Sequence, residues 1–126
     1  MKIGGLAVPY GPSKYYAEIM HEALKESNGK KVPLIHNFGE PTVIGHAELI
    51  ETERGIYAIL NFVEMFSDEE LIDITKNNRI GGMVNRVKYD EQHRIVEGCV
   101  TSARIYRTSQ TVCLRLGKLE IIQEEK

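Results

Sequence analysis

Three strands are predicted by the segment VPLIHNFGEPTVIGHAELIETERGIYAILNFVE, residues 32–64. Apolar and polar residues alternate over 42–51, which is typical of a half-buried β-strand, and branched or aromatic residues are frequent over 32–36 and 56–64. The link TERG joins the last two stretches, and its glycine can take the positive φ of a tight turn. We therefore expect a hairpin, preceded by a strand in which Pro33 indicates a start at a sheet edge.

Two helices are predicted, one on each side of these strands. Ser13 can cap the first, whose apolar residues recur every three or four positions through Leu24 before a Ser-Asn-Gly stop. Its expected apolar face consists of Tyr16, Ile19, Met20, Ala23 and Leu24. The second helix begins at Ser67, where Ser67 and Glu70 have the spacing of a capping box, and it ends at an Asn-Asn pair.

The rest of the chain is predicted to be extended. A strand over 2–10 carries paired glycines at Gly4 and Gly5, which indicate a bulge or a close backbone approach. Later strands are expected over 80–89, 94–106, 111–116 and 119–122, followed by a frayed tail. Because so many strands must protect their edges, we expect an α+β, mainly β fold. It is a small, partly closed antiparallel β-barrel with two helices packed outside, in a single domain over residues 1–126.

Composition excludes several classes of protein. The 126 residues carry a net charge of −2, from 16 Lys and Arg against 18 Asp and Glu, with no dense run of one sign. We therefore expect no nucleic-acid partner and no anionic membrane surface. The apolar runs are too short for a membrane span or a secretory signal, which indicates a cytoplasmic protein. Cys99 and Cys113 are too few for a disulfide framework and are expected to be buried thiols.

The sequence contains no metal or cofactor motif. Its four histidines and two cysteines lack the short paired spacings of a zinc site, so we expect no bound metal. Gly81 and Gly82 precede strand-like residues and do not open a helix, so they form neither a phosphate loop nor a dinucleotide fingerprint. No cofactor is therefore expected.

The pattern of residues 32–58 is the most informative one in the chain. An apolar strand ends in His36, and a short loop with a proline, an Ile-Gly step, an alternating strand and an acidic turn with Gly55 follow. This pattern resembles the prohead (capsid maturation) protease family of tailed phages. The opening GGLAVPYG is similar to the first strand of that family, and the likeness covers most of residues 3–109. The resemblance implies a fold related to the herpesvirus assembly proteases and a serine endopeptidase that cuts scaffold and capsid proteins.

The resemblance assigns the catalytic base to His36, and a strand-end histidine can take a proton from a hydroxyl at neutral pH. The nucleophile does not carry over, because Gly82 stands where the family has its serine. A later Glu-x-Ser stretch of the family resembles Arg107-Thr108-Ser109, so the acidic residue is also replaced, although Ser109 remains.

Two hydroxyls on the following strand are candidates to replace the missing serine. If residues 90–93 form a four-residue loop, the antiparallel ladder sets Thr101 opposite Gly82 and Ser102 opposite Gly81. Directly opposed residues share a face, so Thr101 can project near the vacant position, with Ser102 on the other face, and a one-residue slip would exchange their roles. Ordinary strand hydroxyls are the alternative interpretation, and the thiol of Cys99 is a weaker candidate.

Three functions remain open. The first is a phage or prophage protein with a prohead-protease-like fold that is non-proteolytic and acts in head assembly by binding a capsid or scaffold protein; the short chain favours it. The second is an active serine/threonine-type endopeptidase with His36, Thr101 and Ser102 as catalytic residues. The third is a generic β-barrel interaction module, whose candidate anchors are Tyr10, Tyr15, Phe38 and Phe66. A homo-oligomer is compatible with all three.

Overall fold

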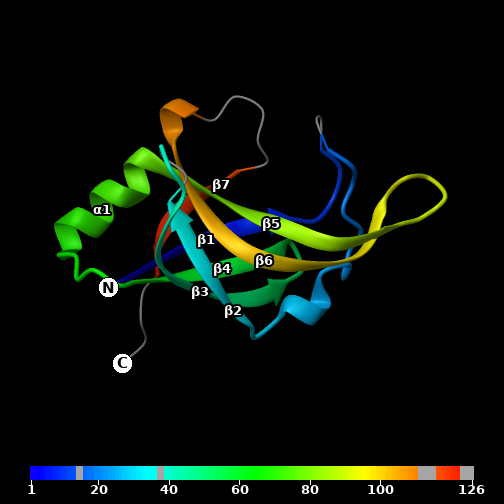
Figure 1. Ribbon diagram of the computed structural model, residues 1–126, viewed down its shortest axis with the longest axis horizontal. Coiled ribbons are helices and arrows are strands. Elements are labelled where there is room, and N and C mark those ends of the chain that lie inside the picture. The colour runs from blue at the N-terminus through cyan, green and yellow to red at the C-terminus, as the bar shows by residue number, and fades with distance from the viewer. Residues whose placement is uncertain (14–15, 37–38, 111–115, 123–126) are drawn as a thin grey trace.

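The computed structural model describes residues 1–13, 16–36, 39–110 and 116–122 (Figure 1). In these residues, strands close a barrel in the order β1-β4-β3-β2-β6-β5-β7, so the expected mainly β barrel is confirmed. The strands are β1 (Lys2–Pro9), β2 (Lys31–His36), β3 (Thr42–Thr52), β4 (Gly55–Phe62), β5 (Asn78–Tyr89), β6 (Ile95–Arg107) and β7 (Gly117–Ile122). The helical elements are α1 (Asp68–Asn77) and two 3-10 turns, η1 (Lys25–Ser27) and η2 (Thr108–Gln110).

The predicted hairpin is formed by β3 and β4. Thr52 pairs with Gly55, which leaves a two-residue turn between them, and the Thr52 hydroxyl donates to the Gly55 carbonyl at 3.0 Å. Gly55 has a φ of +136°, and a Cβ there would lie 2.1 Å from the Val8 carbonyl oxygen. Only glycine fits this turn, because both the backbone angle and the approach of β1 exclude a side chain.

The barrel departs from the predicted one in two ways. It is closed, because β7 pairs with both β1 and β5, where a partly closed barrel was expected. It is also not wholly antiparallel, because β2 runs parallel to β6, with Leu34 beside Ala103 and His36 beside Ile105. Residues 31–33 pair with β3 alone, in agreement with the edge start predicted from Pro33.

The first predicted helix is wrong. Residues 16–24 form bends and turns, and α1 is the α-helix of the described chain. Gly11 and Ile19 exchange backbone hydrogen bonds of 2.7 and 3.3 Å, and Ile95 of β6 bonds to the residues on both sides of Ile19 at 2.8 and 2.9 Å. These non-local bonds replace helical ones. The apolar spacing instead reflects burial against the barrel, where the exposed fractions are 4% for Ile19, 7% for Ala23 and 0% for Leu24.

The second predicted helix is α1, and its capping box is present. Ser67 Oγ accepts from the Glu70 backbone N–H at 3.2 Å, and Glu70 Oε1 accepts from the Ser67 N–H at 3.1 Å. Leu71 is buried, and the helix packs against β7, β1 and β5 at one end of the barrel (Figure 1). In the described part of the chain, no helix combines the length and the apolar character that a membrane crossing requires.

The core lies inside the barrel, and six strands each supply a fully buried aliphatic side chain. These residues are Ile3, Leu34, Leu49, Ile56, Ile80 and Ile105. The close approach predicted at the paired glycines is confirmed, since a Cβ on Gly5 would lie 2.4 Å from the Lys118 carbonyl oxygen. The bulge of β1 lies instead between Leu6 and Val8. The strand expected over 111–116 and the tail from Gln123 fall almost entirely outside the described residues.

Candidate functional site

An apolar pocket of about 490 Å³ opens at the end of the barrel where β2 ends. Its walls come from the ends of β2 and β6, the start of β3, the end of β4, the link to α1, and α1 itself. The apolar lining residues are Val43, Ile44, Phe62, Val63, Phe66, Ile74 and Ile105, and the polar ones are His36, Glu64 and Asn78. A mainly apolar concave surface with a few polar groups is the usual form of a binding site.

Local contacts hold the pocket open. The rings of Phe62 and Phe66 meet edge to face, 5.2 Å apart at an interplanar angle of 88°. The Val63 N–H donates to the Ile44 carbonyl at 2.9 Å, so the link after β4 begins bound to β3. On the far wall, Asn78 Nδ2 donates to the Ile74 carbonyl at 3.0 Å and ties the end of α1 to β5. The wall residues are therefore fixed by packing and hydrogen bonds.

His36 is half-buried at the last position of β2. It pairs with Ile105, and residues two apart in a strand share a face, so His36 lies on the same face as the fully buried Leu34. The side chain of His36 therefore extends the inner face of the barrel into the pocket. The candidate base predicted from the sequence lies at a mainly apolar opening of the barrel.

The predicted register of the β5–β6 hairpin is wrong. Gly82 pairs with Ala103, not with Thr101, and Ser102 pairs with Met83, not with Gly81. Thr101 is the extra residue of a β-bulge, because the next pair joins Val84 to Val100.

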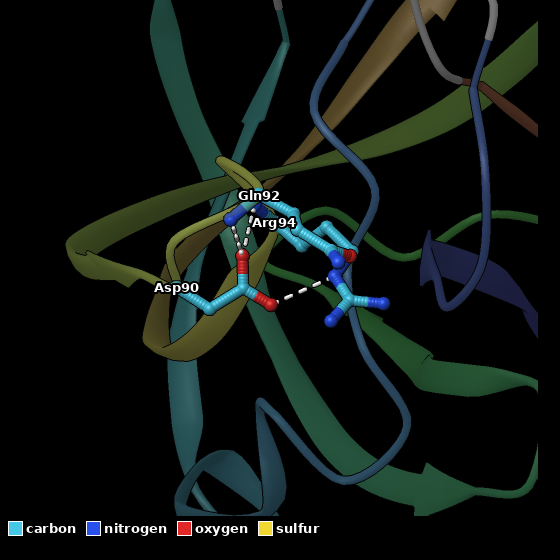
Figure 2. A network of polar contacts seen from close by, with 3 residues as sticks. All are labelled: Asp90, Gln92 and Arg94. Carbon is cyan, nitrogen blue, oxygen red and sulfur yellow. Dashed lines mark hydrogen bonds and ion pairs between the residues drawn. The ribbon is translucent and has the colours of Figure 1, made fainter.

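The shift amounts to two residues: the bulge at Thr101 accounts for one, and a hairpin loop shorter than expected accounts for the other. The Asp90 N–H donates to the Arg94 carbonyl at 2.9 Å, so three residues and not four form the loop. Figure 2 shows how the Asp90 carboxylate organises it: the carboxylate accepts from the backbone N–H groups of Gln92 and Arg94, both at 2.9 Å, and from Arg94 Nε at 2.7 Å. The hydrogen bond from the Arg94 N–H contributes most to holding the pKa of Asp90 below its ordinary value.

The structure does not bring Ser102 to the face that carries His36. Ser102 lies three residues before Ile105, so its Cα is roughly 10 Å from that of His36 along the strands. Ser102 also alternates with the inward residues Ala103 and Ile105, which places it on the outer face. There it is buried and accepts from Arg104 Nε at 3.3 Å.

Thr101 is exposed at the bulge of β6. Its hydroxyl accepts from Asn85 Nδ2 at 2.5 Å and lies 3.4 Å from the Met83 carbonyl, to which it donates. The Thr101 hydroxyl thus links β6 to β5. Neither of the two candidate hydroxyls, of Thr101 and Ser102, is placed beside His36.

The glycine at the family's serine position has a packing role. Gly82 pairs with the buried Ala103, and a Cβ there would lie 2.6 Å from Val8 Cγ2. A side chain at position 82 would meet β1 across the barrel. Gly82 therefore allows β1 and β5 to approach each other.

A second apolar groove, of about 340 Å³, lies along β5. Beyond Arg79 and Ile80, the edge of β5 that faces β7 makes no further strand pairing among the described residues. The groove is lined by Val8, Ile19 and Gly82 among others. Its lining contains no titratable side chain other than those of Tyr16 and Tyr106. It therefore has fewer groups for catalysis or polar binding than the pocket at His36, whose lining includes a histidine and a glutamate.

The other candidate residues, which are the possible metal ligands, the cysteines and the aromatic anchors, do not form a common site among the described residues. Within the described ranges, no three His, Cys, Asp or Glu side chains are close enough to hold a metal ion. Cys99 is a half-buried free thiol, and Cys113, Tyr15 and Phe38 lie outside the described residues. Of the proposed aromatic anchors, Phe66 lies in the pocket. Tyr10 donates to Glu51 at 2.5 Å, and burial together with this bond raises its pKa.

Comparisons of this chain with models of protein families, with curated proteins and with solved structures find no match. Sequence reasoning identified His36 and Phe66 but missed the pocket that joins them. One signal was present: Val63 and Met65 flank a glutamate between a strand and a capping box, where a linker is usually polar.

Proposed function

We propose that this chain is a non-proteolytic binding domain with a prohead-protease-like fold, which holds a capsid or scaffold protein during the assembly of a phage head. The observation that carries the proposal is the open apolar pocket whose lining includes His36. The phage context is supported by the sequence pattern of residues 32–58 and by the barrel on which that pattern lies.

The absence of proteolysis is supported by the geometry around His36. A general base must lie within about 3 Å of the hydroxyl that it activates. Ser102 is on the opposite face of the sheet, Thr101 is bonded to Asn85, and Gly82 has no side chain. His36 instead adds a polar side chain to the mainly apolar lining of the pocket.

Binding is supported by the size and chemistry of the pocket. A volume of about 490 Å³ is within the range of ligand sites and accommodates one or two large apolar side chains. Phe62 and Phe66 give it aromatic walls, which are frequent in protein interfaces. Burial of a partner's aliphatic or aromatic side chain here would contribute about 2 kcal/mol.

The experiment is a pull-down from phage-producing cells with tagged chains, with mass spectrometry of the captured proteins. The wild-type chain and the control Ile50→Ser, on the outer face of β3, should recover an intact capsid or scaffold protein, and Val63→Ser with Met65→Ser should not. A fluorophosphonate probe should label none of the chains. Labelling, or cleavage of the captured protein that His36→Ala abolishes, would establish a protease instead. Recovery of no head protein would contradict the assembly role.

A further inference from the structure

The rim of the His36 pocket carries the most exposed large apolar side chains of the described residues. Met65 is 97% exposed, Val63 83% and Val43 62%, whereas the other exposed large apolar side chains are at 50% or below. Val43 and Val63 line the pocket itself. Apolar side chains gathered at one opening indicate a surface that another chain covers.

The apolar surface extends beyond the pocket. A second depression of about 260 Å³ lies beside it and shares Phe62, Glu64 and Phe66 with the first. Met65 and Leu71 line this second depression together with the polar residues Lys2 and Asn61. Two adjoining hollows that share Phe62 and Phe66 suit a segment that presents two apolar side chains.

The same region is strongly acidic. Residues 63–77 contain five carboxylates, at Glu64, Asp68, Glu69, Glu70 and Asp73, against one basic residue, Lys76. The N-terminus of α1 offsets only about half a charge. Glu64 lines both hollows, and the ion pairs formed among the described residues involve none of these carboxylates. Lys2 and Met1 also line the second hollow, so with Lys76 and the amino group of Met1 three basic groups stand against the five carboxylates. A net negative charge remains for a partner to neutralise.

We propose that this surface selects a cationic amphipathic segment of its partner, with apolar anchors that enter the two hollows and lysine or arginine side chains that face Glu64 and α1. The proposal rests on the binding function above and specifies its ligand class. Charge complementarity decides between occupants: an acidic segment would meet a net charge of the same sign along Glu64 and α1.

The test measures the fluorescence anisotropy of two labelled peptides titrated with the full chain. Both carry leucines at the helical spacing i, i+3, i+4, i+7, and the other positions are lysine in one peptide and glutamate in the other. The lysine peptide should bind at least about tenfold more tightly at low salt, and the difference should shrink at high salt because exposed charges are screened.

Variants locate the binding surface. Val63→Ser with Met65→Ser should weaken binding of the lysine peptide about tenfold, and Glu64→Gln with Asp73→Asn about fivefold at low salt. The matched controls are Ile50→Ser for the apolar change and Glu53→Gln with Glu91→Gln for the charge change, and they should bind like the wild type.

Each contradictory result points to a different failure. Equal affinity for both peptides would overturn the charge selection while leaving the binding function in place. Binding that the rim variants do not change, or no binding by either peptide, would overturn the surface itself. Loss of head-protein capture in cells, with lysine-peptide selectivity intact, would contradict only the assembly role.

Discussion

The two ends of the barrel differ in how they are covered by other segments of the chain. At one end, the segment between β1 and β2 covers the opening, and Ile19, Ala23 and Leu24 are buried there. At the other end, Val63 and Met65 remain exposed beside a pocket (Figure 1 shows η1 and α1 on opposite sides of the barrel). The difference shows that the chain can cover an opening with its own residues, whereas among the described residues no such segment lies over the pocket at His36.

At the covered end, hydrogen bonds from backbone N–H groups of β6 hold the covering segment in place. The Ser27 hydroxyl accepts from the Val100 N–H at 2.9 Å, and the Ala23 carbonyl accepts from the Gly98 N–H at 3.2 Å. These two N–H groups on the edge of β6 away from β5 are therefore satisfied without a second neighbouring strand. Ser27 is fully buried. The link 63–67 at the open end makes one such bond to β3, from Val63.

The largest expected effect separates the two ends directly. Leu24→Ala at the covered end should reduce the free energy of unfolding by about 3 kcal/mol, because it leaves a cavity in a site with 0% exposure. Met65→Ala at the open end should change it by less than about 0.5 kcal/mol, because the side chain is 97% exposed. Urea unfolding of both variants measures the difference, and equal effects would contradict the distinction between the ends.

Gly82→Ser tests the interior between the two ends. The new side chain would meet Val8, so the free energy of unfolding should fall by about 2 kcal/mol. The loss should be smaller in a Val8→Ala background, which a double-mutant cycle measures. Restoring the family's serine should give no fluorophosphonate labelling. A stable, labelled Gly82→Ser chain would mean that position 82 is open to solvent near His36.

Ser67→Ala probes the helix that forms one wall of the open end. Loss of the capping box should cost about 1 kcal/mol. Because α1 lies outside the barrel, hydrogen exchange should accelerate at the amides of α1 while protection persists at Leu34 and Ile105. Uniform acceleration throughout the barrel would show that the wall and the core unfold as one unit.

Asp90→Asn tests the hairpin loop, where the effect should be smallest. The folded pKa of Asp90 lies below its ordinary value of 3.8, so its charged form stabilises the fold. This contribution is present above the unfolded pKa and is lost as the pH falls through the folded value. The wild type should therefore exceed Asp90→Asn in stability at neutral pH, and the excess should vanish in acid. An NMR titration midpoint for Asp90 above 3.8 would contradict this sign.

Local signals account for the parts of the fold that the sequence predicted. The capping box of Ser67 and Glu70 and the turn before Gly55 depend on residues within four positions of each other, and both are present. The first helix failed because Ile19 is bonded to Gly11 and lies beside Ile95, which is 76 residues away. Apolar residues that recur every three or four positions indicate which side chains are buried, but they do not specify the backbone conformation of the segment.

The site was only partly predictable for the same reason. The resemblance of residues 32–58 singled out His36 at the end of a strand, but its surroundings depend on the parallel pairing of β2 with β6 and on the link after β4. The positions of Thr101 and Ser102 depend on a bulge and on a loop that Asp90 shortens by one residue. Such shifts change which face a side chain occupies, and the pattern of residues in a strand does not reveal them.

The most direct test of the open end as the binding end is a methyl NMR titration of the full chain with the lysine peptide. We expect the methyl signals of Val43, Val63 and Ile74 to shift with the peptide while those of Ile19 and Leu24 do not. Shifts confined to Ile19 and Leu24, or no shift at Val63 and Ile74 at saturating peptide, would contradict it.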